Sequence, residues 1–108
     1  MMDTAGTPGA QFRRSSALIP GTSVTMAFME FKDIDRKPLH TRVQDPGTAI
    51  LQVGVRDIDA TVQALKAAGV TVISKNGEPV VNGTAKFCLV RDPNNLFLEL
   101  FQRGARTQ

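Results

Sequence analysis

The stretch "VGVRDIDATVQALKAAGVTVIS" (residues 53–74) decides the fold, because it contains the end of one strand, a helix and the next strand. Asp57 is a good helix N-cap, and Gly69 suits the left-handed position that commonly follows a helix. The apolar residues between them repeat at the spacing of one helix face: Ile58, Val62 and Leu65. We therefore expect a helix between Asp57 and Gly69, preceded by a strand over 49–55 and followed by a short strand over 70–74.

Two further strands are expected toward the C-terminus, over 84–90 and 96–102, with a turn at 92–95 between them. The order from Ala49 onward is then β-α-β-β-β. The first and last of these strands alternate, so each presents two distinct faces. One face is aliphatic and should pack against the helix: Leu51, Val53, Val55, Leu96, Leu98 and Leu100. The other face is more mixed and cannot lie under the same helix: Ile50, Gln52, Gly54, Phe97, Glu99 and Phe101.

The first half of the chain has a weaker pattern. Its opening residues are rich in Gly, Pro, Ser and Thr, which is typical of a flexible tail. "SVTMAFMEFK" (23–32) predicts one strand, and a long polar loop follows it. We divide the chain into four segments: a flexible tail (1–22), a preceding strand and loop (23–46), the β-α-β-β-β module (47–102) and a C-terminal tail (103–108).

Composition restricts the classes of function. The 108 residues suit one small domain with a thin core, so help from a second copy is expected. The net charge of +3 is spread along the chain among acidic residues, and Tyr and Trp are absent, which argues against a nucleic-acid partner. No apolar stretch approaches the roughly 18 residues that span a membrane. The single cysteine, Cys88, lies in an apolar run and is expected to be a buried thiol in a reducing, cytoplasmic environment.

The order of elements, together with "VGVRDIDATVQALKAAGVTVIS" and "RDPNNLFLELFQ" (91–102), resembles the vicinal oxygen chelate superfamily. This is the group of glyoxalases, bleomycin-resistance proteins and extradiol dioxygenases. The resemblance covers roughly residues 47–102 and is to the C-terminal module. It implies an α+β fold in which two β-α-β-β-β modules pair around a cavity. Asn95 stands where the family usually has Gly, and Asn is the next-best tolerated residue at positive φ.

The resemblance also implies where a metal would bind. Metal-dependent members take ligands from the first and last strands of each module. By the spacing of the last hairpin, Glu99 falls at the last-strand ligand position, whereas the first-strand ligand, commonly His, falls at Ile50, which has no lone pair. The single histidine, His40, lies in the preceding loop and does not match. We therefore expect no cofactor, with Glu99 as the ligand if a divalent metal binds, helped by His40 or by a weak oxygen ligand from Gln52.

Three functions remain open. The first is a metal-free small-molecule binding protein, which holds an apolar or cationic ligand in a cavity between the paired modules of a homodimer. The ligand-binding candidates are the six residues of the mixed face: Ile50, Gln52, Gly54, Phe97, Glu99 and Phe101. The second is a divalent-metal-dependent lyase, isomerase or dioxygenase, whose catalytic residues the sequence does not identify. The third is a structural or interaction module with a vestigial cavity.

Overall fold

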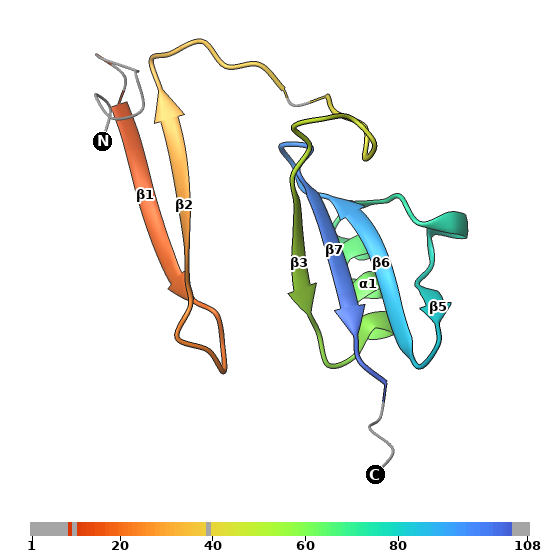
Figure 1. The fold of residues 1–108 in the computed structure, drawn as a ribbon. Coiled ribbons are helices and arrows are strands. Elements are labelled where there is room, and N and C mark those ends of the chain that lie inside the picture. The colour runs from red at the N-terminus through yellow and green to blue at the C-terminus, as the bar shows by residue number, and fades with distance from the viewer. Residues whose placement is uncertain (1–8, 10, 39, 105–108) are drawn as a thin grey trace. The chain divides into compact units, whose positions relative to one another are not determined.

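The computed structural model describes residue 9, residues 11–38 and residues 40–104. The chain divides into two compact units, residues 1–37 and residues 38–108. Each unit has its own sheet (Figure 1).

The first unit is a two-stranded antiparallel hairpin. β1 (Gln11–Leu18) pairs along its whole length with β2 (Thr25–Lys32). One cross-strand contact joins the Phe12 and Phe31 rings, whose centroids are 6.3 Å apart. Another is the 2.6 Å ion pair between Arg13 and Glu30. This guanidinium donates a hydrogen bond to Glu30 and holds the pKa of that carboxyl below its usual value.

β1 corrects the sequence-based prediction of a flexible tail over 1–22. Residues 11–18 form a strand, so the N-terminal part contains two strands rather than one. The physical reason is that β1 has no clear apolar alternation and is defined by its backbone pairing with β2. Residues 1–8 lie outside the described residues.

The second unit is an α+β module with the predicted order of elements. β3 (Ile50–Gly54) leads into α1 (Ile58–Ala67), and β4 (Thr71–Val72), β6 (Ala85–Arg91) and β7 (Phe97–Gln102) follow. The strands lie in the order β3-β7-β6-β4, with β3 parallel to β7 and the other neighbours antiparallel. The 3₁₀ turn η1 (Lys75–Gly77) follows β4, and one short strand was not predicted: β5 (Val80–Asn82), which pairs with β6.

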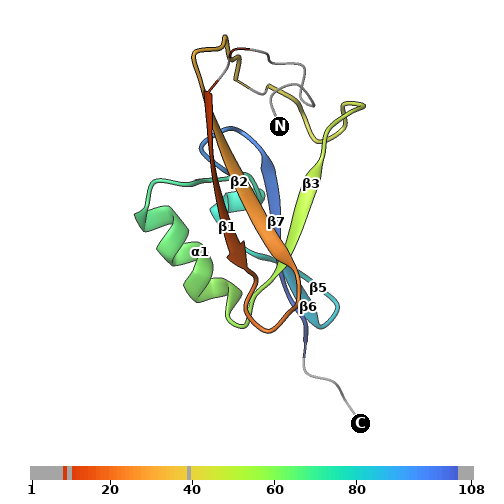
Figure 2. The same ribbon diagram turned by 90° about the vertical axis from the view of Figure 1, so that its left-hand side faces the viewer.

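The helix α1 covers one face of this sheet (Figure 2). Asp57 is its N-cap, since the carboxylate accepts a 3.0 Å hydrogen bond from the backbone N–H of Ala60. Gly69 follows the helix with φ of +83°, as predicted. Within the described part of the chain, no helix has the length and apolar character needed to cross a membrane.

The core lies between α1 and the sheet. Its buried members come from the helix and from two strands: Ile58, Val62, Cys88, Val90 and Leu100. The expected aliphatic face of the strands is confirmed for Val53, Leu98 and Leu100, which belong to this core or pack against it. Leu51 lies on the same face, since it pairs with Leu98, but it remains 38% exposed on the edge strand β3 and is not packed against the core. The turn at 92–95 is also confirmed: Asn95 has a φ of +66° and tolerates it without a glycine.

Candidate functional site

The face of the sheet opposite α1 brings together all six ligand-binding candidates. β3 and β7 run parallel and place them in three cross-strand pairs: Ile50 with Phe97, Gln52 with Glu99, and Gly54 with Phe101. Since side chains alternate along each strand, these pairs lie on one face while Val53 and Leu100 face the helix. The candidate site is therefore three successive pairs along the two strands.

The middle pair carries the polar chemistry. The Gln52 amide Nε2 donates a 2.6 Å hydrogen bond to Oε1 of Glu99. A hydrogen bond to an ionised carboxylate is stronger than a neutral one, so it holds both side chains in position. The sequence analysis placed both residues on one face of the sheet, and the structure joins them. The two residues meet as neighbours in a parallel pair of strands, however, and not across a cavity.

The two residues of the first pair differ in exposure. Phe97 is only 1% exposed, and the Arg91 guanidinium lies 4.3 Å from the centroid of its ring. Arg91 also donates a 3.2 Å hydrogen bond to the backbone carbonyl of Thr41 in the loop before β3. Ile50 remains 41% exposed. The open part of the face therefore begins at Ile50 and Glu99 rather than at Phe97.

The last pair combines a large ring with a residue that has no side chain. A Cβ atom at Gly54 would lie 3.2 Å from Cζ of Phe101, so the absence of a side chain lets the ring lie against β3. A shallow pocket of about 460 Å³ is found at this end of the face. Gly54 and Phe101 both line it, as do Arg56 and Arg103.

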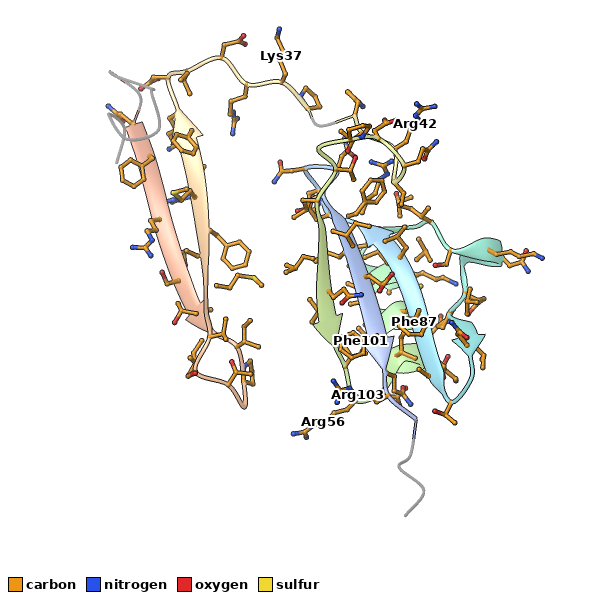
Figure 3. All side chains as sticks on the ribbon, viewed as in Figure 1. Lys37, Arg42, Arg56, Phe87, Phe101 and Arg103 are labelled. Atoms are coloured by element: carbon orange, nitrogen blue, oxygen red, sulfur yellow. The ribbon has the colours of Figure 1, made fainter. Side chains whose placement is uncertain are left out.

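Three residues of β6 share this face and were missed by the sequence analysis. Phe87 pairs with Phe101, Leu89 with Glu99, and Arg91 with Phe97. Figure 3 shows Phe87 and Phe101 on these neighbouring strands. The signal was available in "KFCLVR" (86–91): if Cys88 and Val90 lie in the core, the residues between them must point to the other face.

The donor set of the second unit does not complete a metal site by itself. Glu99 and Gln52 supply oxygens, whereas a catalytic divalent metal commonly takes about three protein ligands. His40 is exposed in the loop before β3. Among the described residues, no three His, Cys, Asp or Glu side chains are grouped so that they could hold a metal. A metal at Glu99 would therefore need ligands from a second module or a second copy.

Comparison with known proteins places these features in a family. The family model of the Glyoxalase/Bleomycin resistance protein/Dioxygenase superfamily matches residues 3–100. A glyoxalase family protein from Bacillus cereus superimposes with a TM-score of 0.81 over 96% of this chain and 70% of its own, at 15% identity. Another solved structure, described as a conserved domain protein, has a TM-score of 0.57 at 18% identity, over 83% of this chain and 70% of its own.

Sequence relatives are proteins named probable lactoylglutathione lyase from two Vibrio species. The Vibrio parahaemolyticus protein is 45% identical over 60 residues, which are 54% of this chain and 43% of the relative. The Vibrio cholerae protein is 42% identical over 52 residues, which are 48% of this chain and 37% of the relative. The match thus spans less than half the length of either relative. The family-model match extends over nearly the whole chain, and the chain belongs to the Glyoxalase/Bleomycin resistance protein/Dioxygenase superfamily.

Proposed function

We propose that this chain binds a small molecule on the face formed by β3, β7 and β6. The observation that carries the proposal is the Gln52–Glu99 hydrogen bond, which fixes a polar pair next to apolar surface. Ligand sites in proteins commonly combine an apolar lining with a few well-placed polar groups.

Each open residue of the face has a part in this proposal. Ile50 and Phe101 offer apolar contact to the body of the ligand. The Glu99 carboxylate accepts a hydrogen bond from a ligand hydroxyl or amine, and Gln52 keeps that carboxylate in place. Phe97 supports the face from beneath Arg91. A second copy of the chain, in a cytoplasmic homodimer, would cover the face and exclude water from it.

Ligand-observed and protein-observed NMR tests the proposal. The full chain is screened against a library of small apolar molecules that carry hydroxyl, amine or carboxyl groups. We expect hits that shift the amide signals of Gln52, Gly54 and Phe101. These hits should bind at least about tenfold more weakly to Glu99→Ala, the loss expected when a charge-assisted hydrogen bond is removed.

The matched control is Glu78→Ala, which removes an exposed carboxylate that lies between η1 and β5 and pairs with Lys66 of α1. This variant should bind the hits as the native chain does. Hits that bind equally well to Glu99→Ala would contradict the proposal. A complete lack of hits would favour the third reading, a structural or interaction module with a vestigial cavity.

A divalent-metal-dependent lyase is the second candidate, and the names of the two Vibrio relatives favour it. In that case Glu99 would supply a carboxylate ligand and Gln52 would orient it, while the metal would act as a Lewis acid. Metal analysis of the purified chain tests this alternative. Stoichiometric metal that is lost in Glu99→Ala would support it, whereas metal content unaffected by this variant would count against it.

A further inference from the structure

The pocket at the last pair of the face is basic. Its lining comes from the ends of β3 and β7 and the residues that follow them: Gly54, Val55, Arg56, Phe101, Gln102 and Arg103. Arg56 and Arg103 project at this end of the two strands, near Phe101 (Figure 3). Arg56 and Arg103 are therefore the charged residues of this lining, and no carboxylate residue is among the lining residues.

Neither arginine is neutralised by the salt bridges of the described residues. Over residues 9, 11–38 and 40–104, the cations of the salt bridges are Arg13, Arg42, Lys66 and Lys86. The acids that follow Arg56 in sequence are engaged elsewhere. Asp57 caps α1, and Asp59 forms a 2.6 Å ion pair with Lys86. An anion could therefore bind Arg56 and Arg103 without first breaking one of the salt bridges given above.

Phe101 supplies a large apolar part of the pocket lining. The Phe101 ring lies against Gly54, and the Arg103 guanidinium is 6.0 Å from the centroid of that ring. An apolar group can therefore pack on Phe101 while a charged group on the same molecule reaches the arginines. Arginine is suited to this role because its planar fork binds carboxylate and phosphate oxygens in pairs.

We infer that this pocket binds the anionic end of the ligand, as a carboxylate or phosphate group joined to an apolar body that packs on Phe101. The inference rests on the proposed small-molecule binding and specifies the chemical class of the ligand. Glu99 precedes Phe101 by two residues, roughly 7 Å along the strand, so the same ligand can present a hydrogen-bond donor there. The sequence alone suggested an apolar or cationic ligand. With Arg56 and Arg103 in the pocket, we instead expect a ligand that carries an anionic group.

Three probes test the inference on the full chain by ¹H–¹⁵N NMR titration. Hydrocinnamate carries a carboxylate, phenyl phosphate carries a phosphate, and hydrocinnamamide is the uncharged match of the first. Each is titrated into the native chain and into Arg56→Gln and Arg103→Gln. Lys75→Gln is the control, because it removes one positive charge from η1, outside the residues that line the pocket.

We expect at least one anion to shift the amides of Gly54, Val55 and Phe101 and to bind about tenfold more tightly than the amide. Each arginine variant should weaken this binding by about tenfold, added salt should weaken it further, and Lys75→Gln should leave it within about twofold. The stronger of the two anions identifies the group that the pocket prefers. If the amide binds as tightly as the acid and the arginine variants have no effect, the anionic class is overturned while small-molecule binding stands. If none of the three probes shifts the face, the anionic class is likewise overturned, and small-molecule binding is then decided by the library screen and its Glu99→Ala comparison.

Discussion

The Cys88 thiol should be nearly inert in the folded protein. It is 0% exposed in the core, and burial raises the pKa of the thiol, so little of the reactive thiolate is present at neutral pH. We predict that a disulfide reagent such as Ellman's reagent labels the native protein about a hundredfold more slowly than the protein in denaturant. Equal rates in the two states would show that the core between α1 and β6 is not closed.

Asp45 makes the loop before β3 sensitive to acid. Hydrogen bonds from the Arg42 side chain and backbone hold the pKa of the Asp45 carboxyl below the ordinary value of an aspartate. Because the folded pKa is depressed, the stabilisation is present above the ordinary pKa of Asp and is lost as the pH falls through the folded value. An NMR titration should place the Asp45 midpoint below that of an ordinary aspartate, and Arg42→Gln should raise it. A midpoint that does not change in this variant would rule out the ion pair as the cause.

Individual site residues differ in how far the sequence reveals them. The period of two residues along β3 and β7 predicted that Gln52 and Glu99 share a face, and the structure joins them by a hydrogen bond. The cover over Phe97 was not predictable in this way. It comes from Arg91, which reaches the backbone of Thr41 fifty residues earlier in the chain. Local periodicity contains no information about such a distant contact.

At the scale of elements, the N-cap of α1 is a sharp test of the helix. Asp57→Ala removes the hydrogen bond that the carboxylate accepts from the N–H of Ala60. We predict that it lowers the free energy of unfolding by about 1 kcal/mol. Asp57→Asn should cost much less, since Asn is also a good N-cap. Urea denaturation of the three proteins measures both effects, and equal losses for Ala and Asn would assign the effect to charge instead of capping.

The two hairpins show why elements differ in predictability. The segment β6–β7 has apolar alternation and an Asp-Pro turn, and Asp92 fixes that turn by accepting hydrogen bonds from the backbone N–H groups of Asn94 and Leu96. β1 has neither feature, and polar residues occupy both of its faces. It becomes a strand because β2 offers a continuous row of backbone partners. A strand defined by its neighbour cannot be found from its own residues.

For the whole molecule, the two compact units should differ in stability. Among the residues that the structure describes, the buried core lies within residues 38–108, whereas the first unit is a two-stranded hairpin, an arrangement that is marginal by itself in water. We predict that a fragment of residues 38–108 keeps dispersed NMR signals and a cooperative urea transition. A fragment of residues 1–37 should show random-coil signals. A non-cooperative transition of the longer fragment would show that the module needs the hairpin to fold.

The hairpin is also where a second copy is expected to contribute. Four of its large apolar side chains are exposed, between 48% and 60%: Leu18, Val24, Phe28 and Met29. Phe28 and Met29 are consecutive strand residues and point to opposite faces, so both faces of the hairpin offer apolar surface to a second copy. We predict that the full chain sediments with twice the 11.7 kDa mass of one chain, and that Phe28→Asp weakens this association by at least about tenfold. Lys75→Gln, which alters η1 in the other unit, should leave the association unchanged. A monomeric mass for the native chain at high concentration would mean that the ligand face of β3, β7 and β6 is completed without a second copy.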